Sequence, residues 1–405
     1  MAKVKIQGHA SGTGILTVTA PNTSSDRTIT LPDATGTLLN SDGDGSSLTG
    51  ANANRPNANP IVYNGDMLIA QRSTSEAGKT GSDYYTSDRW HIRISSGGTW
   101  TITQSTDVPT AEGFTSSLKL DNTATSTDAA MRVGIRQYWE GQDLQYLKKG
   151  TANAETITVA FWVKATKTGT HICELSDSNS RHCAISYTVS STNTWEHKVV
   201  NFPADTSGVI DNDNSNELMI MFFVAAGTDY TSGSLATTWA TSSDANRAVG
   251  QVNGADSTSN DFLITGIQLE VGTYTSATLP PFQHESYGAS LTRCQRYYQH
   301  IVEGNQKMVG IATWANTTQV NMLLELSPTM RTKPSVDYTT GTDYWTISGS
   351  SGSDGSYDNV IQNSWSTGRN QHLWSNTGTA NGTAGYANYW FSDNASAKLA
   401  LSAEF

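Results

Sequence analysis

Tryptophan and arginine side chains in this sequence have the chemistry that holds a sugar, because an aromatic face stacks on a pyranose ring while polar groups bond its hydroxyls. Trp162 alternates with apolar Phe161 and Val163, and Arg136 stands two residues before Tyr138. Alternation of this kind places Trp162 and Arg136 on strand faces opposite a core. We predict both as glycan-binding residues. Packing is the alternative, because tryptophan often anchors cores and arginine often stacks on a ring.

A second group of aromatic residues lies near the C-terminus among glycine, serine and asparagine. Rigid rings in polar loops are typical of adaptable binding surfaces, and such rings are also common where chains pack together. Both interpretations stay open. From this group we predict four further glycan-binding residues: Trp345, Trp365, Trp374 and Trp390.

Two segments could bind a metal ion. Residues 211–217 offer oxygen ligands at alternate positions, but an EF-hand would need glycine at Asn216 and a carboxylate at Phe222, so a solvated turn is favoured over calcium. A cysteine and histidine pair on each side of residues 177–180 could attract zinc, but adjacent His182 and Cys183 must point to opposite strand faces. We predict no metal and no cofactor, with calcium as the alternative.

Motifs for catalysis are missing from the sequence, which has no Gly-x-Ser-x-Gly elbow, no phosphate loop and no His-Glu-x-x-His. A glycan-degrading spike would need two carboxylates facing one groove. The sequence alone cannot pair its candidates Glu112, Glu140, Asp143 and Glu174, and it has no repeat of the kind that builds a β-helix. We predict no catalytic residues and no enzyme activity.

Composition indicates the elements that position these side chains. Of 405 residues, 15% are charged and 36% hydrophobic, and much of the rest is Ser, Thr, Asn and Gly, which favours short strands and turns. A net charge of −11 gives no basic surface for nucleic acid or anionic membrane. Without a signal peptide or spanning segment, and with three cysteines, the chain is expected to be soluble and assembled in a cytoplasm.

Period-two alternation predicts several strands with one buried face. The apolar positions of residues 157–163, 90–94 and 131–135 alternate in this way, and in residues 261–271 the predicted core face carries Leu263, Ile267, Leu269 and Val271. Residues 218–225 are apolar on both faces, so that strand must be covered twice, within the domain or at a subunit interface. We favour the interior.

The strand pattern divides the chain into three parts. Residues 1–58 contain two short strands and a linker, and so small a hairpin needs other chains or a partner for stability. Residues 59–288 are predicted to form one β-sandwich. Residues 289–405 are predicted to form a small β domain entered by a helix at 289–302. The fold class is therefore all-β.

Four phrases resemble segments of tail-fibre and related virion appendage proteins of bacteriophages, cyanophages among them. They occur in the same order along most of the chain: Thr28-Ile29-Thr30-Leu31-Pro32-Asp33-Ala34-Thr35-Gly36-Thr37-Leu38, Ser87-Asp88-Arg89-Trp90, Ile264-Thr265-Gly266-Ile267-Gln268-Leu269-Glu270-Val271-Gly272 and Cys294-Gln295-Arg296-Tyr297-Tyr298-Gln299.

The resemblance implies a homotrimeric virion fibre whose N-terminal region attaches to a phage tail or capsid protein. It also implies a jelly roll similar to carbohydrate-binding modules, and a distal tip that contacts host-surface polysaccharide. The expected function is adsorption by weak sites multiplied over several chains. Two alternatives remain: a structural capsid or tail decoration without a receptor role, and a glycan-degrading tailspike.

Overall fold

A computed structural model describes residues 60–348, 355–377 and 382–405 of the protein. Chain contacts divide the sequence into two units, Met1–Ala51 and Asn52–Phe405. The predicted N-terminal hairpin lies outside the described residues. Within the described residues, no helix is long and apolar enough to cross a membrane.

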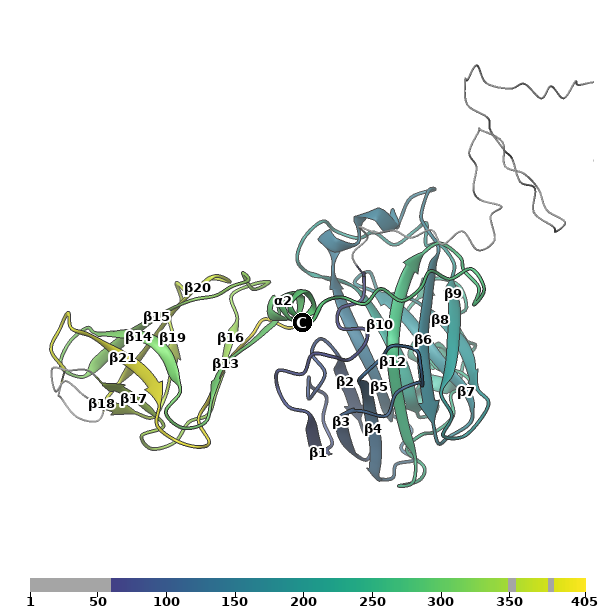
Figure 1. Cartoon of the computed structure of the whole chain (residues 1–405). Coiled ribbons are helices and arrows are strands. Elements are labelled where there is room, and N and C mark those ends of the chain that lie inside the picture. The colour runs from purple at the N-terminus through teal and green to yellow at the C-terminus, as the bar shows by residue number, and fades with distance from the viewer. Residues whose placement is uncertain (1–59, 349–354, 378–381) are drawn as a thin grey trace, which may run out of the picture. The chain divides into compact units, whose positions relative to one another are not determined.

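Two six-stranded antiparallel sheets form a β-sandwich (Figure 1). Most neighbouring strands are not consecutive in sequence, as in jelly rolls. Sheet A has the order β1 (Ser75–Lys79), β3 (Thr99–Ser105), β4 (Ser117–Ala124), β12 (Asp261–Val271), β6 (Ile157–Ala165), β9 (Glu196–Phe202). Sheet B has the order β11 (Ala240–Thr241), β8 (Arg181–Val189), β7 (Gly169–Asp177), β10 (Asn216–Ala226), β5 (Arg132–Glu140), β2 (His91–Ser95).

The apolar positions of the alternating strands fill the space between the two sheets. The predicted apolar positions of β2, β5 and β6 all lie in one buried cluster, so these predictions are confirmed. Phe222 of β10 packs at its centre, with its ring 4.8 Å from that of Phe161 and 6.5 Å from that of Trp90. The all-β sandwich predicted from composition and alternation is therefore present.

Strand β10 is buried on both faces, as predicted. Its second apolar face carries Met219, Met221 and Phe223, which pack in a separate cluster beneath residues 227–252. We call this segment the strap; it contains helix α1 (Thr228–Thr231) and the short 3-10 helix η4 (Asp244–Asn246). Because the chain covers β10 itself, this strand gives no reason to expect a partner chain.

Beyond the sandwich, helix α2 (Tyr287–Gln295) leads into two further antiparallel sheets. The helix was predicted to reach residue 302, but it ends at Gln295. Strand β13 (Tyr298–Glu303) follows, and Tyr298 and Val302 pair with β22. The three-stranded sheet has the order β13, β22 (Lys398–Ser402), β16 (Ser335–Tyr338). The seven-stranded sheet D has the order β18 (Gly355–Tyr357), β17 (Trp345–Ser348), β21 (Ala387–Ser392), β14 (Met308–Trp314), β15 (Gln319–Glu325), β20 (Asn370–Asn376), β19 (Ile361–Gln362). The predicted domain boundaries stay a prediction.

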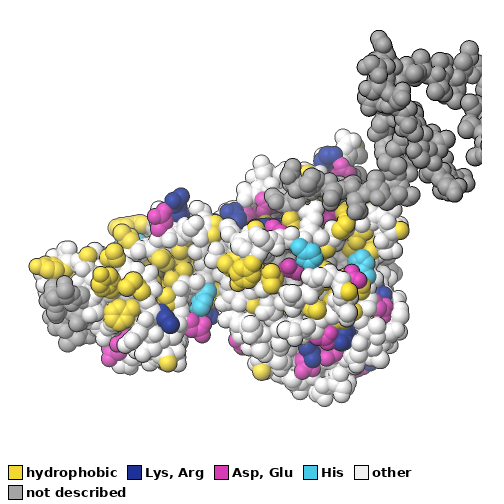
Figure 2. All heavy atoms as spheres, viewed as in Figure 1, with side chains coloured by type: hydrophobic (Ala, Val, Ile, Leu, Met, Phe, Trp, Pro, Cys, Tyr) yellow, Lys and Arg dark blue, Asp and Glu magenta, His cyan; other side chains and the backbone are white. Residues whose placement is uncertain are grey.

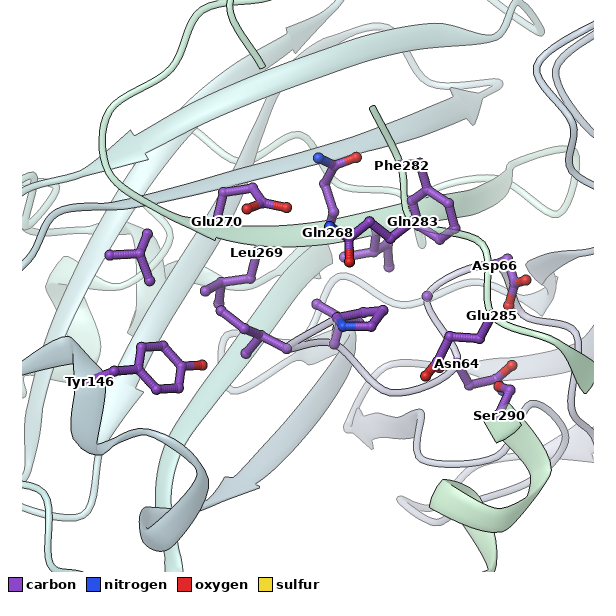
Figure 3. Close-up of a pocket in the computed structure, with 16 residues that line it drawn as sticks. Asn64, Asp66, Tyr146, Gln268, Leu269, Glu270, Phe282, Gln283, Glu285 and Ser290 are labelled. Atoms are coloured by element: carbon purple, nitrogen blue, oxygen red, sulfur yellow. The ribbon is translucent and has the colours of Figure 1, made fainter. Parts of the chain in front are cut away.

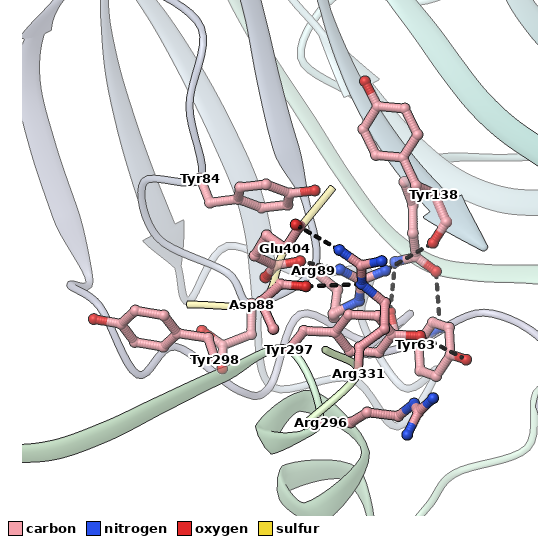
Figure 4. Close-up of polar contacts among 12 residues, drawn as sticks. Tyr63, Tyr84, Asp88, Arg89, Tyr138, Arg296, Tyr297, Tyr298, Arg331 and Glu404 are labelled. Atoms are coloured by element: carbon pink, nitrogen blue, oxygen red, sulfur yellow. Dashed lines mark hydrogen bonds and ion pairs between the residues drawn. The ribbon is translucent and has the colours of Figure 1, made fainter. Parts of the chain in front are cut away.

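A buried polar cluster ties the last residues of the chain to the sandwich (Figure 4). The guanidinium of Arg89 is fully buried, pairs with the carboxylate of Glu404 and donates to the Tyr138 carbonyl at 2.7 Å. It also lies 3.4 Å from the ring centre of Tyr297. Arg72 reaches the other oxygen of Glu404 at 3.2 Å. We call these groups the Arg89 cluster.

Candidate functional site

The outer face of sheet A carries an aromatic pair. Trp162 of β6 lies directly opposite His197 of β9, and their ring centres are 5.0 Å apart at an interplanar angle of 38°. The indole is half-buried and the imidazole is exposed. Phe161 and Val163 point into the core. The alternation of β6 therefore turns Trp162 outward, as predicted.

The pair borders an open hollow of about 420 Å³, which we call the Trp162 groove. Other rings in its lining pack edge to face, with Phe282 centred 5.1 Å from Phe114 and 4.8 Å from His284. In Figure 2, histidine and hydrophobic side chains lie together on the face that carries β12 and β6 in Figure 1. Polar groups in the lining are Glu112, Gln268 and Ser276. The groove thus combines ring surfaces with hydrogen-bonding groups.

A β-bulge in β12 brings Gln268 to this face. The register against β6 shifts by one residue between Thr265, opposite Trp162, and Gln268, opposite Ala160. Gly266 makes the bulge with φ of +61°, and a side chain there would lie 2.6 Å from the ring of Phe114.

The bulge also corrects the predicted core face of β12. Leu263 was expected to share a face with Ile267, but it pairs with Lys164 and lies outside the core cluster, whereas Ile264 and Phe262 lie inside it. The extra residue inverts the alternation, so the prediction fails before the bulge and holds for Ile267 and Leu269 after it.

A smaller cavity of about 260 Å³ adjoins the groove and shares Gln268 and Phe282 with it (Figure 3). Its walls are mostly apolar, and Tyr146 stands at one side. Burial raises the pKa of Asp66 in this lining, and Glu285 is held by Arg293 at 2.7 Å. The two hollows therefore meet at Gln268 and Phe282.

Charge in the Trp162 groove is low. Partial desolvation lowers the pKa of His197, and the nearby Glu112 carboxylate opposes this only in part. The imidazole is therefore neutral at pH 7 and can both donate and accept a hydrogen bond. Lys164, the next outward residue of β6, is paired with Asp107 at 2.6 Å. The groove is suited to uncharged hydroxyl-bearing ligands.

The structure does not bring the six predicted binding residues together. Trp162 lies in the groove, while Arg136 is half-buried on the outer face of sheet B. Trp345 and Trp390 are fully buried with ring centres 6.3 Å apart, so their rings pack the core of sheet D. Trp374 is half-buried on β20, and Trp365 is 79% exposed and stacked on His372. Exposed ring surface therefore occurs at Trp162, Trp374 and Trp365.

No protein-family model and no curated protein matches the sequence. Solved structures do. One is the enzymatically active domain of bacteriophage CBA120 tailspike protein 4, at 14% identity and a TM-score of 0.27; the match covers 52% of this chain and 21%, about a fifth, of that one. Another is the family 11 carbohydrate-binding module of cellulase Lic26A-Cel5E of Clostridium thermocellum, at 15% identity and TM-score 0.26, covering 49% and 97%.

The N-terminal cellulose-binding domain of Cellulomonas fimi β-1,4-glucanase C is similar at 13% identity and a TM-score of 0.24, covering 54% of this chain and 100% of that one. With TM-scores of 0.27 or less, these similarities carry no argument about function. The description of the fold rests on the strand order and register given above.

Sequence reasoning missed most partners of Trp162 in the groove. His197 could have been found, because Val200 and Phe202 alternate on β9 and leave the odd positions facing outward. Phe282 and His284 follow the sandwich strands in a proline-containing loop, where no periodic signal exists. The position of Gln268 on the face of the groove depends on the bulge in β12, which the sequence pattern did not predict.

The cysteine and histidine pairs are separated as the strand argument predicted. Cys173 and Cys183 are free thiols in the core, whereas His182 bonds Glu174 on the outer face of sheet B. In the part of the chain that the structure describes, no three His, Cys, Asp or Glu side chains are grouped to hold a metal ion.

Proposed function

We propose that this chain is part of a phage virion appendage that attaches to host-surface glycan through the Trp162 groove, without a catalytic step. The observation that carries the proposal is the open groove itself. It sets the half-buried face of Trp162 beside neutral His197 and the amide of Gln268.

The arrangement suits a sugar for physical reasons. The apolar face of a pyranose gains by covering an indole, since aromatic side chains bury large areas at low conformational cost. Its equatorial hydroxyls need donors and acceptors, which Glu112, His197 and Ser276 supply. The buried Gln268 already donates to the Pro280 carbonyl at 3.0 Å. A hollow that is open to solvent leaves room for the rest of a chain beyond the bound unit, whereas an enclosed pocket accepts only an end. Polysaccharide is therefore the proposed ligand class.

Replacing Trp162 with alanine should weaken glycan binding about tenfold to a hundredfold, because the main stacking surface is lost. Titration calorimetry with the neutral oligosaccharide that binds best in an array measures this change. Trp365→Ala is the control, since it removes a 79% exposed ring from the loop between β19 and β20. If Trp365→Ala abolishes binding and Trp162→Ala does not, the site is at Trp365 and the proposal is wrong.

The purified parent protein also tests the two alternative functions, a glycan-degrading spike and a decoration without a receptor role. Reducing ends released from host polysaccharide would show a glycan-degrading spike and contradict the non-catalytic role. Purified protein should compete with phage for cells. A decoration without a receptor role would not compete.

The proposed assembly is a homotrimer, attached to a phage tail or capsid protein through the N-terminal region. Sheet D supports self-association because Ile311, Leu323 and Tyr389 are 60%, 73% and 57% exposed, and large exposed apolar surface is typical of interfaces. Sedimentation at micromolar concentration should give three times the mass of the chain. Leu323→Glu should lower that mass, and a monomeric parent protein would exclude the trimer.

A further inference from the structure

Three arginine side chains lie side by side on the outer face of sheet B. Arg93 of β2 is opposite Gly134 of β5, and Arg132 and Arg136 stand two residues to either side of that glycine. Paired residues of antiparallel strands share a face, and diagonal neighbours are about 7–8 Å apart. Because Gly134 has no side chain, the side chain of Met221 forms the bottom of the space between the three arginines. We call these arginines the guanidinium cluster.

The cluster has no counter-ion among the described residues. None of its members forms an ion pair there, and the Nε atoms of Arg93 and Arg132 are buried without a hydrogen-bond partner. The Nε of Arg136 donates to the neutral acceptor His91 Nδ1 at 3.1 Å. Burying a charged donor without a partner is unfavourable, so such groups normally have a hydrogen-bond partner.

Surrounding groups do not neutralise the cluster. Arg247 lies nearby, and its own charge is balanced by Glu174 at 2.7 Å and Asp244 at 3.5 Å. Burial and then the charges of Arg247 and Arg93 lower the pKa of Arg132. Burial, with Arg136 and Arg93, lowers the pKa of His91 to about 3, so His91 adds no charge at pH 7. The excess positive charge is therefore local and persistent.

Aromatic rings flank the guanidinium groups. Arg132 lies 5.0 Å from the ring centre of Tyr230, on the strap, and Arg136 lies 5.2 Å from that of Tyr138. A ligand that bonds the arginines therefore also meets apolar ring surface. This combination fits a ring-shaped molecule with an anionic substituent better than a free ion.

We propose that the guanidinium cluster binds the carboxylate or sulfate group of an acidic saccharide. The proposal goes beyond the proposed function, because it adds a second site that takes a different class of glycan. Guanidinium forks match planar and tetrahedral oxyanions with two parallel hydrogen bonds. The cluster and the Trp162 groove lie on opposite outer faces of the sandwich, so they can be tested separately.

The test is titration calorimetry of the full chain with four probes: a neutral galactose trisaccharide, its sulfated form, a galacturonic acid trisaccharide and sodium sulfate. We expect an acidic trisaccharide to bind at least tenfold tighter than the neutral one. The double variant Arg93→Gln, Arg132→Gln should bind the acidic and the neutral trisaccharide with equal affinity. Its affinity for the neutral trisaccharide should equal that of the parent protein. Arg369→Gln, an exposed arginine paired with Glu325, is the control and should change nothing.

The outcomes distinguish the two proposals. If no saccharide binds but sulfate binds the parent and not the double variant, the oxyanion site stands and the saccharide source is wrong. If the double variant keeps the acidic preference, or Trp162→Ala removes it, the cluster is not the site. Circular dichroism confirms folding, and if the double variant does not fold, Arg93→Gln alone and Arg136→Lys should each reduce the preference at unchanged neutral binding.

Discussion

Glu404→Gln is expected to lower the free energy of unfolding by about 3–5 kcal/mol, because it leaves a fully buried arginine without its counter-ion. The amide keeps the shape of the carboxylate and removes its charge. Burial disfavours the charged guanidinium of Arg89, but Glu404 and the neighbouring tyrosines outweigh this and raise the pKa of Arg89. A guanidinium is not deprotonated at neutral pH, so Arg89 stays charged in the variant without Glu404, and the free-energy cost of burying that charge remains.

Urea denaturation followed by tryptophan fluorescence measures this change. The matched control is Glu325→Gln, whose ion pair with Arg369 is exposed on both sides and should contribute less than about 1 kcal/mol. Equal effects for the two variants would show that the Arg89 cluster does not hold the chain's last residues to the sandwich.

Glu174→Gln should have the second largest effect, because Glu174 holds the strap. Its buried carboxylate accepts from Arg247 at 2.8 and 2.7 Å and bonds His182 at 2.9 Å. Breaking a buried pair of this kind costs about 3–5 kcal/mol. Asp244→Asn is the control: it touches the same Arg247 from an exposed position and should cost less than about 1 kcal/mol.

The loss of folding stability in Glu174→Gln should depend on pH. Burial favours the protonated carboxyl, but hydrogen bonds from His182 and Arg247 outweigh it and lower the pKa of Glu174 below its usual 4.5. A lowered pKa stabilises the fold above pH 4.5, and this contribution disappears as the pH falls through the folded-state value. The difference in the free energy of unfolding between the parent protein and Glu174→Gln should therefore be largest near pH 7 and should decrease below pH 4.5. A difference that grows in acid would contradict this assignment.

Local alternation made much of the sandwich predictable from sequence. The buried faces of β2, β5, β6 and β10 follow from neighbouring residues alone, since a strand shows its two faces to alternate positions. The outward placement of Trp162 and Arg136 followed from the same rule. These residues were therefore predicted on the correct faces without knowledge of their partners.

Features that depend on distant residues were not predictable. Arg89 and Glu404 are 315 positions apart, and nothing near either one indicates the pair. Arg93 became part of a cluster only through the register of β2 against β5. Trp345 and Trp365 have similar local composition, yet one is fully buried and the other open, because only tertiary packing separates them.

The bulge in β12 is a point at which the strand can lose one residue without exchanging its two faces. Removing Gly266 would place Ile267 opposite Phe161 and leave Gln268 opposite Ala160, so the register with β6 would become unbroken. Ile267 and Leu269 would stay on the core face, and Gln268 would stay on the face of the groove. Removing a residue from a regular part of the strand would instead turn core residues outward on one side of the deletion and cover that surface with hydrocarbon.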